Sequence, residues 1–178
     1  MKRGLIQVYT GDGKGKTTAA MGLALRAAGQ GLRVRIFQFL KGGSPVSGEF
    51  LGVERCNLPM GWKRFDDQIP PMFSKGDVDE AELGRRLRRA LEEVREVMRA
   101  GQADVIILDE INVALGQKWL DVGDALSFLA EKPAEVELIL TGRGAPPELQ
   151  EHADLVTEMR EIKHPFQAGI GARKGIEF

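Results

Sequence analysis

The segment Thr10–Thr18 (TGDGKGKTT) combines three glycines, two lysines and three threonines directly after a short apolar run. Glycines let the chain curl so that successive backbone N–H groups point at phosphate oxygens. In such a loop Lys16 reaches the polyphosphate, and the Thr17 hydroxyl is placed for Mg²⁺. The residues predicted to hold the nucleotide phosphates are Gly11, Asp12, Gly13, Lys14, Gly15, Lys16, Thr17 and Thr18.

The loop departs from the usual phosphate-binding pattern in one respect. That pattern places a glycine where Thr10 stands, and here Gly11 follows one position late. A glycine-rich turn without a ligand is the alternative, but a strand before the segment and a helix after it favour the phosphate loop. A dinucleotide-binding fingerprint is disfavoured, because it requires a glycine where Lys16 stands.

A second pair of candidate residues, Asp109 and Glu110, ends the apolar run 103–108. In a phosphate-loop protein, an acidic residue at the carboxyl end of a buried strand lies beside the loop and holds the metal or its water. We expect Asp109 to hydrogen-bond near Thr17 and to reach the metal through water, and Glu110 to ligate Mg²⁺ or orient a reacting group. The alternative is that both acids cap the amino end of a helix over 112–117.

ATP is the favoured nucleotide, because the guanine-reading pattern Asn-Lys-x-Asp is absent. The last apolar strand before the C-terminal region instead ends in Thr141-Gly142-Arg143. Arg143 is either a phosphate contact or an ordinary surface arginine, and the residues alone leave both open.

The composition limits which binding partners and which cellular location are expected. The 178 residues carry 25 basic and 26 acidic side chains and a net charge of −1, so no global field favours nucleic acid. The single cysteine, Cys56, suits a reducing cytoplasm, and no apolar stretch is long enough for a signal peptide or a membrane span. We therefore expect a cytoplasmic protein.

Short apolar runs alternate with helical patterns, which indicates an α/β fold with a mostly parallel sheet and helices on both faces. Residues 1–178 are expected to form a single domain of the phosphate-loop, RecA-like class. The predicted strands are 4–10, 32–40, 103–108, 136–140 and 155–159, and the predicted helices are 16–29 and 77–101. Residues 41–75 are predicted to be irregular, with scattered aromatics and a weak strand pattern at 51–58. Such a stretch in a compact domain is commonly functional.

Several segments together resemble the ATP:cob(I)alamin adenosyltransferases of the corrinoid-biosynthesis type. They are the phosphate loop with its helix, residues 38–42 (QFLKG), residues 107–110 (ILDE), residues 140–143 (LTGR) and the closing stretch from Ala153. The late-glycine loop and the closing stretch are particular to that family, whereas a strand ending in Asp-Glu is shared with many nucleoside triphosphatases.

The resemblance implies transfer of the 5′-deoxyadenosyl group of ATP to the cobalt of a reduced corrinoid, with release of triphosphate. It also implies a reversed nucleotide, with the γ-phosphate deep in the loop. Lys16, Thr17 and Glu110 would be the catalytic residues, and Mg²⁺ would bind through Thr17 and Glu110, with Asp109 acting through water. The implied partners are ATP, the reduced corrinoid, an electron-donating flavoprotein and a second copy of the chain in a homodimer.

Segment 60–66 (MGWKRFD) differs from the family's Gly-Phe-Thr-Trp-like segment, whose aromatics displace the lower ligand of cobalt. Trp62 and Phe65 are the candidates for that role, and the irregular segment 41–75 is the candidate corrinoid-facing region. Alternatively, both aromatics are core anchors. Since relatives often carry a longer N-terminal extension over the corrinoid, three hypotheses stay open: a corrinoid adenosyltransferase, a phosphate-loop ATPase or kinase, and a non-catalytic relative that binds ATP or a corrinoid.

Overall fold

A sheet of parallel strands organises the protein, as a computed structural model of residues 3–41, 46–55, 57–65 and 79–177 shows. Among these residues six strands pair in the order β3-β2-β4-β5-β1-β6, and every pairing is parallel. The strands are β1 (Ile6–Thr10), β2 (Val34–Gln38), β3 (Met60–Arg64), β4 (Val105–Asp109), β5 (Glu137–Thr141) and β6 (Leu155–Glu158). The predicted parallel α/β fold is therefore confirmed.

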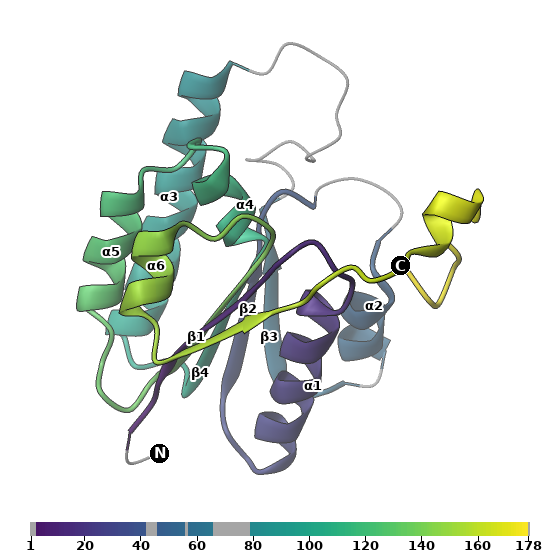
Figure 1. The fold of residues 1–178 in the computed structure, drawn as a ribbon. Helices are drawn as coiled ribbons and strands as arrows, with labels where there is room; N and C mark the ends of the chain where they lie inside the picture. Colours follow the sequence, from purple (N-terminus) through teal and green to yellow (C-terminus); the bar gives the residue numbers. More distant parts are fainter. Residues whose placement is uncertain (1–2, 42–45, 56, 66–78, 178) are drawn as a thin grey trace.

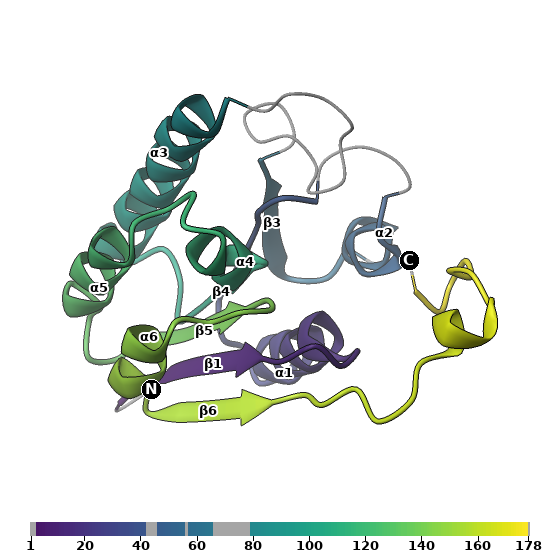
Figure 2. The ribbon, with the colours of Figure 1, turned by 45° about the horizontal axis from the view of Figure 1, so that its top comes forward.

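Helices cover both faces of this sheet (Figures 1 and 2). They are α1 (Lys16–Gly29), α2 (Gly48–Arg55), α3 (Glu80–Arg99), α4 (Ile111–Gly116), α5 (Val122–Ala130) and α6 (Pro147–His152), followed by a 3₁₀ turn at Pro165–Ala168. Helices α1 and α2 lie on one face, and α3, α4, α5 and α6 lie on the other. Within the described part of the chain, none of the helices has the length and apolar character needed to cross a membrane.

The two faces are packed with side chains of different size. On the α1 face, small residues such as Ala20 and Ala24 pack against Ile36 and Ile107, which brings the helix close to the sheet. On the other face, larger side chains of α3 and α5 fill the core against β2, β4 and β5. Because strand β4 is buried on both faces, it places Asp109 at a fixed point in the middle of the sheet.

One prediction for the region 41–75 was wrong. The expected strand at 51–58 is mostly helix α2, and the true strand is β3, which is polar and begins two residues after 58. Strand β3 lies at the edge of the sheet and is only half-buried, so it lacks the apolar run that marks a central strand. Positions 42–45, 56 and 66–75 of this region lie outside the described residues.

The long charged helix was predicted correctly, with slightly different ends. Helix α3 begins after Asp79, whose carboxylate accepts hydrogen bonds from the backbone N–H groups of Ala81 and Glu82 at 3.0 and 3.3 Å. An aspartate at this position satisfies N–H groups that a helix end leaves unpaired. Helix α5 was not predicted from the sequence.

Candidate functional site

The phosphate loop joins β1 to α1 and is held in place by the strand beside it. Gly11 and Gly15 have φ values of 91° and 120°, a backbone region that favours glycine. The backbone N–H of Gly13 donates to the carbonyl of Met159 at 2.7 Å, and a Cβ atom on Gly11 would lie 2.5 Å from that same carbonyl oxygen. The chain following β6 thus packs against the loop closely enough to require glycine at position 11.

Lys16 lies inside the loop that it was predicted to serve. Its Nζ donates to the carbonyls of Gly11 and Gly13 at 2.6 and 2.7 Å, and the residue is 8% exposed. Burial lowers the pKa of Lys16, and the positive charge of Arg143 lowers it further. Arg143 is itself exposed but close enough to act on the loop. A phosphate group would give both cations the counter-charge that the carbonyl dipoles only partly supply.

Other loop residues are less enclosed. Asp12, Lys14 and Thr18 are exposed. The Nζ of Lys14 donates to the carbonyl of Ile176 and to Glu177 Oε1, at 3.0 and 3.1 Å, near the end of the described chain. The closing segment therefore contacts the phosphate loop at a second point, and a phosphate contact by Lys14 stays a prediction.

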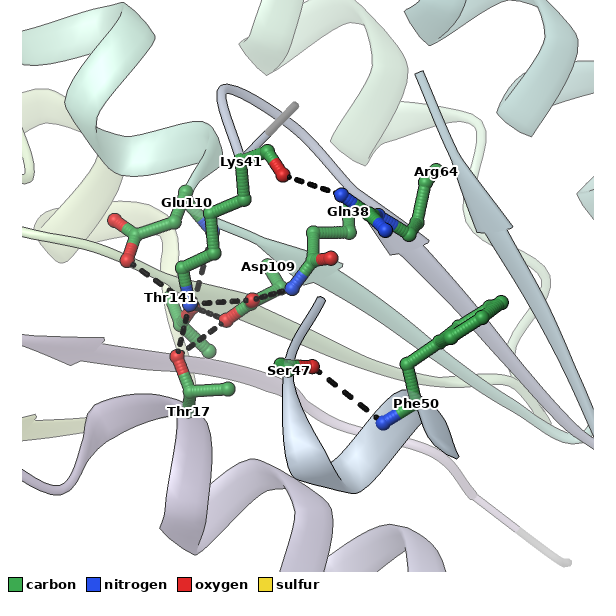
Figure 3. Close-up of polar contacts among 9 residues, drawn as sticks. All are labelled: Thr17, Gln38, Lys41, Ser47, Phe50, Arg64, Asp109, Glu110 and Thr141. Carbon is green, nitrogen blue, oxygen red and sulfur yellow. Dashed lines mark hydrogen bonds and ion pairs between the residues drawn. The ribbon is translucent and has the colours of Figure 1, made fainter. Parts of the chain in front are cut away.

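Thr17 is joined to the end of β4 as predicted (Figure 3). Its hydroxyl donates to Asp109 Oδ1 at 2.8 Å, and Thr141 donates to the same oxygen at 2.7 Å. Gln38 Nε2 donates to Asp109 Oδ2 at 3.0 Å. Burial by itself would raise the pKa of Asp109, but the charge of Lys41 and these three donors outweigh it, so that the pKa lies below its ordinary value.

Lys41 completes this cluster and was not among the sequence-predicted site residues. Its Nζ lies 3.0 Å from Thr17 Oγ1, 3.1 Å from Asp109 Oδ2 and 3.3 Å from Glu110 Oε1 (Figure 3). Burial lowers the pKa of Lys41, but the two carboxylates more than reverse this effect and the net pKa is raised. A usable signal was its position just after β2, since the carboxyl ends of parallel strands meet at one edge of the sheet. We call Thr17, Gln38, Lys41, Asp109, Glu110 and Thr141 the polar cluster.

Glu110 has an unusual backbone conformation for a residue with a side chain. Its φ is 66°, and its N–H donates to the Thr141 hydroxyl at 3.1 Å. Such strain in a non-glycine residue persists where surrounding contacts fix it, often at functional sites. Although Glu110 precedes α4, its side chain makes no capping hydrogen bond, so the helix-cap alternative is wrong for this residue. Burial, together with the charge of Asp109, raises the pKa of Glu110 despite the opposing effect of Lys41.

The polar cluster fits a hard divalent cation. Thr17, Asp109 and Glu110 present oxygen donors, and these oxygens already surround a positively charged group, the Lys41 ammonium. Among the described residues there is no group of three or more His, Cys, Asp or Glu that could hold a metal. This is compatible with Mg²⁺, which is commonly bound by one or two carboxylates together with substrate phosphates.

Trp62 and Phe65 do not lie on the same side of the sheet, which corrects their prediction as a pair acting on one ligand face. Trp62 pairs with Ile36 and packs on the α1 face. Phe65 is 1% exposed and packs against Phe37 and Phe39 on the opposite face, with ring centroids 6.3 and 5.0 Å apart. Residues three apart along an extended chain point to opposite faces, so Phe65 is a core anchor and Trp62 alone stays a candidate.

Trp62 belongs to a group that also contains two residues of the segment 41–75 that were not singled out as site residues from the sequence. Phe50 of α2 meets Trp62 edge to face with centroids 5.7 Å apart, and the Arg64 guanidinium lies 5.7 Å from the centroid of the Phe50 ring. Arg64 Nη2 also donates to the backbone carbonyl of Lys41 at 2.8 Å, which links this aromatic cluster to the polar cluster (Figure 3). No sequence motif identified Phe50 or Arg64 as a site residue. The only signal was the alternation along β3, which places the side chains of Trp62 and Arg64 on the same face of the sheet.

The loop, the threonine bonded to a buried strand-end aspartate, and the parallel sheet define a phosphate-loop, RecA-like nucleotide-binding fold. The crystal structure of the flagellar accessory protein FlaH from Methanocaldococcus jannaschii shares this fold, with a TM-score of 0.57 over 89% of this chain and 72% of that chain. Its sequence identity is 13%, so this likeness concerns the fold alone.

Sequence comparison identifies the family. Residues 2–178 match the ATP:corrinoid adenosyltransferase BtuR/CobO/CobP family. A corrinoid adenosyltransferase of Sinorhizobium sp. is 39% identical to this chain, and the matched region spans 99% of this chain and 81% of that protein. Those of Pseudomonas aeruginosa and Escherichia coli are both 35% identical, covering 99% of this chain and 85% and 87% of theirs. The chain belongs to the ATP:corrinoid adenosyltransferase family; it is a transferase, and its activity is the ATP-dependent adenosylation of a corrinoid.

Proposed function

We propose that the protein transfers the 5′-deoxyadenosyl group of ATP to cob(I)alamin or cob(I)yrinic acid a,c-diamide in the biosynthesis or salvage of adenosylcobalamin. The electron pair of Co(I) forms the bond to the 5′ carbon, the bond from that carbon to oxygen breaks, and its electron pair leaves with triphosphate. The observation that carries the proposal is the hydrogen bond between Thr17 and Asp109, which joins the phosphate loop to the strand end in a chain of this family.

The nucleotide is proposed to bind with its triphosphate in the loop and its adenosyl end toward the corrinoid. The enclosed ammonium of Lys16, held by the carbonyls of Gly11 and Gly13, supports binding of the triphosphate in the loop. Lys16, the Thr17 hydroxyl and the loop N–H groups would neutralise the charge that develops on the leaving triphosphate. Co(I) is already a strong nucleophile, so alignment and neutralisation are the tasks left to the protein.

Mg²⁺ is proposed to bind through Thr17 and Glu110, with Asp109 acting through a water molecule. When bound, the ion would neutralise charge on the triphosphate. The buried Asp109 would orient the Thr17 hydroxyl, and the left-handed backbone of Glu110 would direct its carboxylate to the same point.

The corrinoid is proposed to bind at the aromatic cluster, with Trp62 beside the cobalt. Support comes from the link between Arg64 and the carbonyl of Lys41, which connects the aromatic cluster to the polar cluster. Arg143 is proposed as a phosphate contact, because its charge acts on Lys16. A homodimer, a flavoprotein as electron donor and a cytoplasmic location stay predictions from the family resemblance and the composition.

An assay with ATP, Mg²⁺ and chemically reduced cobalamin tests this function. We expect a light-sensitive cobalt–carbon product and one triphosphate for each product formed. The analogue with an imido group between the β and γ phosphates should also serve as substrate, because the bond that breaks is at the ribose carbon. Phosphate release from ATP without adenosylated product, together with inertness of the analogue, would identify an ATPase instead.

A further inference from the structure

The ammonium of Lys41 occupies the point on which the proposed metal ligands converge. It lies between 3.0 and 3.3 Å from oxygens of Thr17, Asp109 and Glu110. These are the residues proposed to serve Mg²⁺. A divalent cation that used the same oxygens would lie within a few ångströms of the Lys41 charge, in a partly buried site where like charges repel strongly.

The charges of the cluster show when this ammonium is needed. Two neighbouring carboxylates, those of Asp109 and Glu110, are enclosed, and burying such charges without compensation is costly. Lys41 provides one positive charge against their two negative charges. A bound metal would provide two positive charges and would make the lysine redundant at this position.

The side chain of Lys41 can move away from the metal ligands while its backbone stays in place. Its carbonyl is held by Arg64 Nη2 at 2.8 Å, whereas the ammonium is carried on a flexible four-carbon stem. Its charge already acts on Lys16 in the loop, so a triphosphate bound there would lie within range of the displaced ammonium. The anion that arrives with the metal thus offers Lys41 a new partner.

We propose that Lys41 is an internal counter-ion that occupies the metal site of the nucleotide-free protein and gives it up when metal and triphosphate arrive together. This inference rests on the metal site of the proposed function. Lys41 would oppose binding of a divalent cation to the empty enzyme and couple metal entry to triphosphate binding. It is a positioning residue, because it acts through the metal ligands and not on the reacting atoms.

Binding of Mn²⁺ alone, followed by the electron paramagnetic resonance signal of the free ion, tests the proposal without nucleotide or corrinoid. We expect Lys41→Met to bind Mn²⁺ about tenfold more tightly than the unaltered protein, because the competing charge is gone. Lys63→Met is the matched control. Lys63, on β3, forms an ion pair with Glu93 of α3 and does not contact the polar cluster, so the Mn²⁺ affinity of this variant should equal that of the unaltered protein. Equal Mn²⁺ affinity for Lys41→Met and the control would overturn the proposal.

Thermal unfolding with a chelator and with saturating Mg²⁺ provides a second measurement if Lys41→Met is unstable. We expect the variant to melt lower than the unaltered protein in chelator and to recover most of the difference in Mg²⁺, since the metal replaces the missing charge. Lys41→Gln, which keeps a hydrogen-bond donor but no charge, should respond to Mg²⁺ in the same direction. Variants that stay unstable or unfolded in Mg²⁺ would contradict the exchange of one cation for another.

The two proposals fail in different experiments. If the unaltered protein forms no cobalt–carbon product, the proposed function fails whatever the Mn²⁺ result. If product forms and Mn²⁺ affinity does not respond to Lys41→Met, only the counter-ion role is lost.

Discussion

The polar cluster and the aromatic cluster lie next to each other but are held by different forces. In the polar cluster, each oxygen of Asp109 accepts two hydrogen bonds, Oδ1 from Thr17 and Thr141 and Oδ2 from Gln38 and Lys41. In the aromatic cluster, ring contacts dominate, and the buried Nε1 of Trp62 has no hydrogen-bond partner within the described chain. One cluster is preorganised by directional bonds, whereas the other is held by contacts that a bulky planar ligand can rearrange.

Position in the sheet explains this difference. The polar cluster is centred on Asp109 and Thr141, the last residues of β4 and β5, which are central strands buried on both faces, so these two side chains have little freedom. The aromatic cluster stands on β3, a half-buried edge strand, and on the short helix α2. Charge neutralisation requires fixed donors, while a large substrate requires a surface that can adjust.

The largest expected effect is the loss of activity when the charge in the phosphate loop is removed. Lys16→Ala should lower kcat/KM for adenosyl transfer by about a thousandfold, or ~4 kcal/mol, because the leaving triphosphate loses its enclosed cation. Steady-state assays with reduced cobalamin measure this. Lys14→Ala provides the comparison within the same loop: because its ammonium contacts the closing segment, we expect about a tenfold loss or less. Near-normal activity of Lys16→Ala would contradict the role assigned to the loop.

The next effect separates the two aromatic residues by stability. Phe65→Ala should lower the free energy of unfolding by about 3 kcal/mol, because it leaves a cavity beside Phe37 and Phe39 in the core. Trp62→Ala should cost about half as much or less, because Trp62 is only half-buried on an edge strand. Urea unfolding measures both. A larger loss for Trp62→Ala than for Phe65→Ala would reverse the assignment of core and ligand face.

A smaller effect concerns the reaction of the corrinoid itself. Trp62→Ala should slow adenosylation that starts from Co(II) by about tenfold, or ~1.4 kcal/mol, and should affect adenosylation from pre-reduced Co(I) much less. The reason is that the aromatic side chain is proposed to favour the cobalt state that is easier to reduce. Product formation from both starting states measures the split, and equal slowing of the two reactions would refute a role at the cobalt.

The comparison also explains which parts were predictable from the sequence. The phosphate loop and the strand ending in Asp109 follow a local pattern, since the chemistry needs glycines, a lysine and an acid at fixed spacing next to apolar strands. Their meeting through Thr17 was predicted and is confirmed. Helix α1 was predicted with its observed bounds, because its alanines and leucines recur at helical spacing.

What escaped prediction depends on contacts between distant segments. Lys41 acquires its role only when β2 is placed beside β4, and its position just after β2 was the one signal for it in the sequence. Phe65 has the same residue type as a ligand-binding aromatic, and only the alternation of β3 shows that it faces the core. Edge strands such as β3 lack the apolar run that reveals central ones, so register and faces in this region had to come from the structure.

The smallest expected effect tests the sheet at its opposite end, away from both clusters, where β2 and β4 begin. Asp104 accepts hydrogen bonds from the backbone and side chain of Arg33, which lowers the pKa of Asp104 from 3.8 to about 2. A carboxylate with a depressed pKa stabilises the fold above its ordinary pKa, and this contribution is lost as the pH falls toward 2.

Because the pair is largely solvated, Asp104→Asn should cost at most about 1 kcal/mol at neutral pH. Urea unfolding from pH 7 downward should show the difference shrinking below pH of about 4, with exposed Glu135→Gln as the control. A difference that stays constant across this range would mean that the contact stabilises the sheet without its charge.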